Sequence, residues 1–245
     1  MSRSIELHDR EEYKRSMREL LTIDPAKTVA LTIDMQRDFL DPSIATAPVP
    51  PDVAEKVVAD TAEMLDLCRN VGIPVVHCYV SRRVQEAALG GHHAAYTITG
   101  QRAGLSQSLT APARTRVDRV AGSGSEDVMP ALVRDSDFMM GNKREMDSFH
   151  LTDLEMILRR YLNPEVVLIA GINTDTCVYA TTFGASVRGF RPVLIEECVA
   201  SMRGADHHQM ALELMAGSVA WVLTMAELRA KLAAADRTEA QLSSA

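Results

Sequence analysis

Long apolar runs, closely spaced cysteine pairs and clustered basic residues are all missing from this 245-residue chain. No stretch approaches the ~20 apolar residues of a membrane-spanning helix, and the first residues, MSRSIELHDREEYKR, are too charged for a signal peptide. The net charge of −7 and the scattered arginines and lysines disfavour binding to nucleic acid or anionic membranes. We therefore expect a cytoplasmic protein with neither polymer as a partner.

The four cysteines form no CxxC pair and no ligand-spaced cluster. Their spacing therefore indicates neither a disulfide framework nor a zinc site. We expect free thiols, no metal and no cofactor.

What the chain does contain is an alternation of short apolar runs with longer helical patterns, which is typical of repeated βαβ units. Six runs are predicted to be strands, and their uniformly apolar character suits a sheet buried on both faces. The predicted strands are residues 28–33, 73–80, 137–140, 166–171, 192–196 and 219–223. The predicted helices are residues 52–70, 151–161, 176–188, 206–216 and 225–235.

This order predicts an α/β fold: a three-layer, doubly wound (Rossmann-like) parallel six-stranded sheet with helices on both faces. We expect residues 1–245 to form one domain because no linker divides them. Residues 1–26 form an N-terminal leader. Residues 81–124 are a connection long enough to serve as a specificity region or an oligomer contact.

Three chemically useful side chains follow predicted strands. Asp34 ends the first strand, Lys143 follows the third, and Cys177 lies in the turn GINTDTC after the fourth. Ligands of parallel sheets bind outside the carboxyl ends of the strands, so these side chains should face one crevice. Taken singly, they could be a turn aspartate, a solvated lysine and an inert core cysteine. Their coincidence favours a site.

The segments TIDMQRDF, GNKREMDSFHLTDLE and AGINTDTCV, in this order and spacing, resemble the isochorismatase-like superfamily of cysteine hydrolases. The resemblance runs from about Lys27 to Leu228, and it is loose over residues 84–124. It implies a catalytic triad of Asp34, Lys143 and Cys177 with a thioester intermediate. It also implies a cis peptide between Ile172 and Asn173, and an oxyanion hole made by the backbone N–H groups of Asn173 and Cys177.

The residues give this resemblance a chemistry. Lys143 and the helix N-terminus should lower the pKa of Cys177 from ~8.5 and favour a thiolate at neutral pH. The thiolate would attack an amide or ureide carbonyl, and Asp34 would carry the proton to the departing nitrogen. The expected activity is hydrolysis of a small carboxamide, carbamoyl or ureide, which releases ammonia or an amine.

Two comparisons with family patterns disfavour a metal-dependent nicotinamidase and a vinyl-ether hydrolase. Nicotinamidases of this family carry an Asp-x-His metal element after the first strand, whereas DPSIATAPVPPDV has no histidine here. Isochorismatases cleave a vinyl ether and generally lack the cysteine, so Cys177 favours amide chemistry. An isochorismatase-type hydrolase and a catalytically silent binding protein on the same fold remain the alternatives.

The substrate pocket is less well defined by the sequence. Phe39 and Phe149 are pocket walls by resemblance, and Arg82 is suited to a substrate carboxylate because guanidinium binds it with two hydrogen bonds. The other expected pocket residues are His92, His93, Glu145 and Tyr179. Since family members often form dimers or tetramers, the resemblance implies a homodimer or homotetramer.

Overall fold

The protein is built around a six-stranded parallel sheet. The computed structural model describes residues 8–89, 95–115 and 117–243, and the strand order is β3-β2-β1-β4-β5-β6. The strands are β1 (Thr28–Ile33), β2 (Val75–Cys78), β3 (Phe138–Met140), β4 (Val166–Ile172), β5 (Arg191–Ala200) and β6 (Trp221–Leu223). All five neighbouring pairs are parallel, as in Ala30 beside Val75 and Thr28 beside Val166. The predicted doubly wound fold is confirmed.

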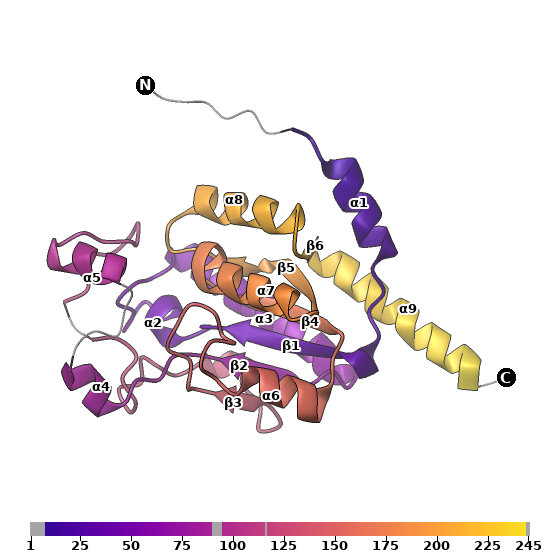
Figure 1. The fold of residues 1–245 in the computed structure, drawn as a ribbon, viewed down its shortest axis with the longest axis horizontal. Helices are drawn as coiled ribbons and strands as arrows, with labels where there is room; N and C mark the ends of the chain where they lie inside the picture. Colours follow the sequence, from indigo (N-terminus) through magenta and orange to yellow (C-terminus); the bar gives the residue numbers. More distant parts are fainter. Residues whose placement is uncertain (1–7, 90–94, 116, 244–245) are drawn as a thin grey trace.

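Helices cover both faces of this sheet (Figure 1). Alternate strand side chains point to opposite faces, so Ala30 joins one hydrophobic core and Leu31 joins the other. The first core is closed by α3 (Pro51–Asn70) and α9 (Met225–Ser243). The second core is closed by α6 (Leu154–Ile157), α7 (Tyr179–Val187) and α8 (Ala205–Ala216).

The observed helices differ from the predicted ones chiefly at their beginnings. Leu151 has a positive φ of 54°, and α6 therefore starts only at Leu154 and continues as a π-helical turn over Leu158–Leu162. The helix predicted from residue 176 is a π-helical turn, Thr174–Val178, followed by α7. The first residues after β4 thus adopt a wider turn than the pattern suggests.

The edge strand β3 is less buried than its apolar sequence predicts. Phe138 is 38% exposed and Met139 is 45% exposed, whereas Met140 is buried. In the described ranges, β3 pairs only with β2 and has no strand on its other side. The expectation of a strand buried on both faces is wrong here because an edge strand lacks one neighbour.

Segments outside the regular βα alternation also form helices. The N-terminal α1 (Glu11–Leu20) lies against the sheet edge, where the indole N–H of Trp221 donates to the Met17 carbonyl at 2.8 Å. The long connection contains α4 (Val84–Leu89) and α5 (Ala95–Arg102), and α2 (Arg37–Leu40) follows β1. Figure 1 shows α2, α4 and α5 beyond the carboxyl end of β1.

None of the helices within the described ranges is long and apolar enough to cross a bilayer.

Candidate active site

A buried ion pair marks the carboxyl ends of β1 and β3. Asp34 directly follows β1, has a left-handed φ of 52° and is fully buried. Lys143 follows β3 and is 2% exposed, and its Nζ donates to Asp34 Oδ2 at 2.7 Å. The structure therefore joins two residues that are 109 positions apart in the chain.

This contact keeps Lys143 charged. Burial alone would lower the pKa of the ammonium, but the nearby Asp34 and Cys177 raise it above its usual value on balance. A cation so held stabilises an anion at the adjacent carboxylate. Asp34 Oδ1, the oxygen that Lys143 does not bind, is buried and has no hydrogen-bond partner among the described residues.

Cys177 opens onto the same cavity as this pair. It lies in the π-helical turn that follows β4, and it is half-buried, whereas Cys68, Cys78 and Cys198 are buried. Asp34 and Cys177 thus line one cavity. A carboxylate beside a thiol can act as its general base.

The pKa of the thiol is raised in this environment, contrary to the lowered pKa expected from the sequence. Burial, followed by the negative charge of Asp34, raises the pKa of Cys177 to about 11, and Lys143 offsets only part of this increase. The expectation was wrong because it counted the cation but neither desolvation nor the carboxylate. A nucleophilic role for this thiol would therefore require a nearby proton acceptor.

The turn that carries the thiol is anchored by the segment after β5. The side-chain oxygen of Asn173 accepts from the Met202 N–H at 2.8 Å, and Asp175 accepts from Ser201 Oγ at 2.7 Å. The Ile172–Asn173 peptide bond is cis, at the position that the family resemblance implies. These contacts hold the turn at the carboxyl end of β4.

Three of the expected pocket residues line the cavity around Cys177. This cavity has a volume of about 100 Å³, and Phe39, Arg82 and Glu145 contribute to its wall. Phe39 and Arg82 are buried, while Glu145 lies exposed at the edge. The small volume favours a compact ligand, since sites for drug-sized ligands measure ~300–1,000 Å³.

Phe149 and Tyr179 belong elsewhere, which corrects the sequence interpretation. Phe149 is buried in the second core with its ring centroid 6.0 Å from that of Phe190. Tyr179 packs against Phe183 at 4.8 Å, and neither side chain is part of the described cavity wall. His92 and His93 lie outside the described residues.

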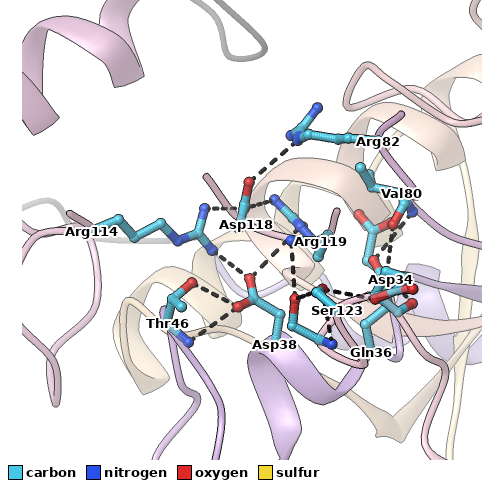
Figure 2. A network of polar contacts seen from close by, with 12 residues as sticks. Asp34, Gln36, Asp38, Thr46, Val80, Arg82, Arg114, Asp118, Arg119 and Ser123 are labelled. Atoms are coloured by element: carbon cyan, nitrogen blue, oxygen red, sulfur yellow. Dashed lines mark hydrogen bonds and ion pairs between the residues drawn. The ribbon is translucent and has the colours of Figure 1, made fainter. Parts of the chain in front are cut away.

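A cluster of buried charges that the sequence interpretation missed forms another wall (Figure 2). Arg114 bridges Asp38 Oδ2 at 3.1 Å and Asp118 Oδ2 at 2.6 Å, and Arg119 also binds Asp118. Arg82 approaches Asp118 from the other side, with Nε 3.3 Å from Oδ1. The only sequence signal was the charged run RTRVDR at 114–119, within the long connection.

A second cavity adjoins the first. It has a volume of about 410 Å³ and lies between α5, the segment from Ala103 to Arg114 and residues 46–47. Thr97, Gln107, Arg114 and Met202 line both cavities. The long connection therefore shapes the surroundings of the thiol.

Within the parts of the chain that the structure describes, no group of three or more His, Cys, Asp or Glu side chains is placed to hold a metal ion.

Comparison with known sequences places these features in a family context. The model of the isochorismatase domain matches residues 28–227. A probable isochorismatase of Pseudomonas chlororaphis is 24% identical over 207 residues, covering 84% of this chain and 87% of that protein. The maleamate amidohydrolase of Pseudomonas putida is 25% identical over 186 residues, covering 76% of this chain and 78% of that protein.

Among solved structures, a cysteine hydrolase from Pseudomonas syringae pv. phaseolicola 1448A has a similar fold. The TM-score is 0.70 at 19% sequence identity, and the match covers 88% of this chain and 96% of that chain. At this identity the likeness establishes the arrangement of the sheet and helices alone.

Proposed function

We propose that this chain, which belongs to the isochorismatase family of hydrolases, is a metal-independent amidohydrolase that uses Cys177 as its nucleophile. Its substrate would be a small carboxamide, carbamoyl compound or ureide. One observation carries the proposal: Lys143 binds Asp34 Oδ2 at 2.7 Å, Oδ1 has no partner among the described residues, and both residues line the cavity of the thiol.

In the first half of the reaction, Asp34 takes the thiol proton while the sulfur attacks the substrate carbonyl. A proton acceptor is required because the pKa of Cys177 lies near 11, well above neutral pH. Lys143 Nζ holds the other carboxylate oxygen, Oδ2, at 2.7 Å. The carbonyl π electrons move to oxygen, and the backbone N–H groups of Asn173 and Cys177 would stabilise that oxyanion.

In the second half, the protonated Asp34 gives its proton to the departing nitrogen as the C–N bond breaks. The products of this step are ammonia or an amine and a thioester at Cys177. Water, deprotonated by Asp34, then attacks the thioester. The carboxylic acid leaves and the thiol regains its proton.

Vinyl-ether hydrolysis is the second candidate because the matched relatives include the probable isochorismatase of P. chlororaphis. The maleamate amidohydrolase of P. putida, at a similar identity, supports the amide reaction instead. The presence of Cys177 beside a carboxylate favours the amide, since ether hydrolysis would not require a thiol.

The test is ammonia release by wild type and Cys177→Ser in the presence of EDTA. The panel is nicotinamide, maleamate, N-carbamoyl amino acids, biuret, ureidoacrylate analogues and simple aryl amides. We expect turnover of at least one compound and a loss of at least ~10⁴-fold in Cys177→Ser, as for other removed nucleophiles.

Asp34→Asn provides the matched check on the proton acceptor and should also abolish turnover. Equal activity of Cys177→Ser and wild type would refute the thiol mechanism and favour ether hydrolysis. Silence of wild type across the panel would support a binding protein on this fold.

A further inference from the structure

The buried charges beside the candidate nucleophile do not balance. Arg82, Arg114 and Arg119 line the cavity, and the described carboxylates that pair with them are Asp38 and Asp118. Arginine stays protonated in proteins, and the Lys143 contact already neutralises Asp34. Among the described ion pairs, three guanidinium groups therefore share two buried carboxylates, which is costly in a buried site, and Glu145, exposed at the cavity edge, pairs with none of them.

Each of the three arginines has a buried side-chain nitrogen without a hydrogen-bond partner among the described residues, and Arg82 makes the fewest described ion pairs. Its side chain is 2% exposed, and its single described ion pair is the 3.3 Å contact from Nε to Asp118. Its Nη1 is buried and has no hydrogen-bond partner within the described parts of the chain. Asp118 cannot move closer to Arg82 to accept a second hydrogen bond without loosening its shorter contact with Arg114, at 2.6 Å.

The surroundings hold these guanidinium groups in place before any ligand arrives. The Arg119 guanidinium lies 4.8 Å from the centre of the Phe39 ring, and that of Arg114 lies 5.8 Å from it. The backbone N–H of Arg82 donates to the Arg119 carbonyl at 2.8 Å, which ties the end of β2 to the long connection. Preorganised donors bind an anion without paying to order the side chains.

We propose that the Arg82 guanidinium, with the positive cluster around it, binds a carboxylate of the substrate while a carboxamide of the same molecule lies at Cys177. This inference rests on the proposed function and specifies its substrate class. Guanidinium matches a planar carboxylate with paired hydrogen bonds. The cavity of about 100 Å³ restricts the substrate to compact molecules, such as monoamides of short dicarboxylic acids or short N-carbamoyl amino acids.

The first experiment compares substrates that differ in this one group. Wild type is assayed with maleamate and succinamate against the neutral diamides maleamide and succinamide. We expect kcat/KM to favour the acids on the order of 10²-fold, because a desolvated charge pair is lost with the diamides. In Arg82→Gln this preference should fall below about tenfold through a higher KM for the acids.

Arg83→Gln is the matched control. Arg83 is the next residue, its side chain is 74% exposed, and it pairs only with Glu86 among the described contacts. The preference for the acids should be unchanged in this variant. Equal use of acids and diamides by wild type, or an equal loss for both classes in Arg82→Gln, would overturn the inference.

A second readout does not depend on amide turnover. Maleate and succinate should protect Cys177 of wild type, but not of Arg82→Gln, from iodoacetamide. Protection of Cys177 without hydrolysis of any amide would support the anion site and refute the proposed reaction. Hydrolysis of diamides without protection by the dicarboxylates would support the proposed reaction and refute the anion site. If thermal melting shows that Arg82→Gln does not fold, Arg82→Lys replaces it and should show a partial loss of protection and preference.

Discussion

At Cys177 the protein holds a thiol with a raised pKa in the same cavity as the Asp34 carboxylate. Two effects raise the pKa of the thiol to about 11: burial and, next, the charge of Asp34. Lys143 acts in the opposite direction but is already engaged by Asp34. Under the proposed mechanism, the thiol would therefore lose its proton during attack, because the raised pKa disfavours a permanent thiolate.

This arrangement predicts the pH dependence of alkylation. The rate at which iodoacetamide modifies Cys177 should rise about tenfold per pH unit throughout pH 7–10, because only the thiolate reacts. In Asp34→Asn the negative charge is lost, the thiol pKa falls and modification at pH 8 should be at least about tenfold faster. Mass spectrometry of the modified peptide measures both rates.

Asp66→Asn is the control for a surface carboxylate, since the Asp66 side chain is 52% exposed. The alkylation rate of Cys177 in this variant should depend on pH as it does in wild type. A wild-type rate that levels off near pH ~8.5, the value of a free thiol, would contradict the raised pKa.

At the scale of elements, the close approach of β1 and β4 brings Asp34, which follows β1, near the turn after β4 that carries Cys177. Gly171 pairs with Ile33, the residue before Asp34, and lies two residues before Asn173. A Cβ at Gly171 would lie 2.4 Å from the Ile33 carbonyl oxygen, and the φ of 154° further disfavours a side chain. Only glycine allows the strands to come this close.

Gly171→Ala should therefore separate β1 from β4 and disturb the site. We expect a loss of about 3 kcal/mol or more in the free energy of unfolding, combining overpacking with backbone strain. Urea denaturation measures the loss. If the free energy of unfolding fell no further than in the control variant Gly72→Ala, the strands could move apart without penalty.

The control is Gly72→Ala, at the turn after α3. Gly72 has a φ of 77°, but a Cβ there would meet no atom of the described residues within 4 Å. This variant isolates the backbone contribution, which should cost about 1–2 kcal/mol.

The long connection between β2 and β3 contributes to the cavity from several points. Arg82, Thr97, Gln107, Arg114 and Arg119 all line it. These contacts support the specificity role that we propose for residues 81–124. An additional role as an oligomer contact, in the expected homodimer or homotetramer, stays a prediction for light scattering to measure.

Across the whole molecule, the other cysteines are buried on both sides of the sheet. Cys68 of α3 and Cys198 of β5 belong to the first core, and Cys78 of β2 belongs to the second. Burial raises the pKa of Cys68 and of Cys78 to about 12, and it raises that of Cys198 further. The folded protein thus keeps these protons at a pH where the unfolded chain releases them.

Stability should consequently fall in mild alkali. An unfolded thiol ionises near pH ~8.5, so between that pH and the folded pKa the unfolded state binds fewer protons and becomes favoured. We expect a loss on the order of 1 kcal/mol for each buried cysteine between pH 7.5 and 9.5. Urea denaturation at the two pH values measures it.

Cys68→Ala should be less stable than wild type at both pH values but lose about 1 kcal/mol less between them. Val57→Ala, also buried on α3, makes a cavity without removing a thiol and should keep the wild-type pH dependence. If both variants show the same drop, the thiols are not its source.

The cytoplasmic location and the absence of nucleic-acid and membrane partners stay predictions from charge and composition. Localisation of a tagged full-length chain would test them.

The amino-acid sequence by itself determined the order of the strands along the chain and the residues that follow them. Strand formation depends on short local runs, such as VVLIA before the GINTDTC turn, and parallel pairing then brings the carboxyl ends together. Asp34, Lys143 and Cys177 could therefore be selected from their positions, and the structure places all of them at one cavity.

Only the tertiary structure decided the cavity wall and the protonation of the thiol. Arg114 and Arg119 reach the site through a connection without strand or helix periodicity, while Phe149, near Lys143 in sequence, turns into the core. The thiol pKa depends on burial and on Asp34, which is distant in sequence. Desolvation and charge act through space, so local sequence patterns carry no measure of either.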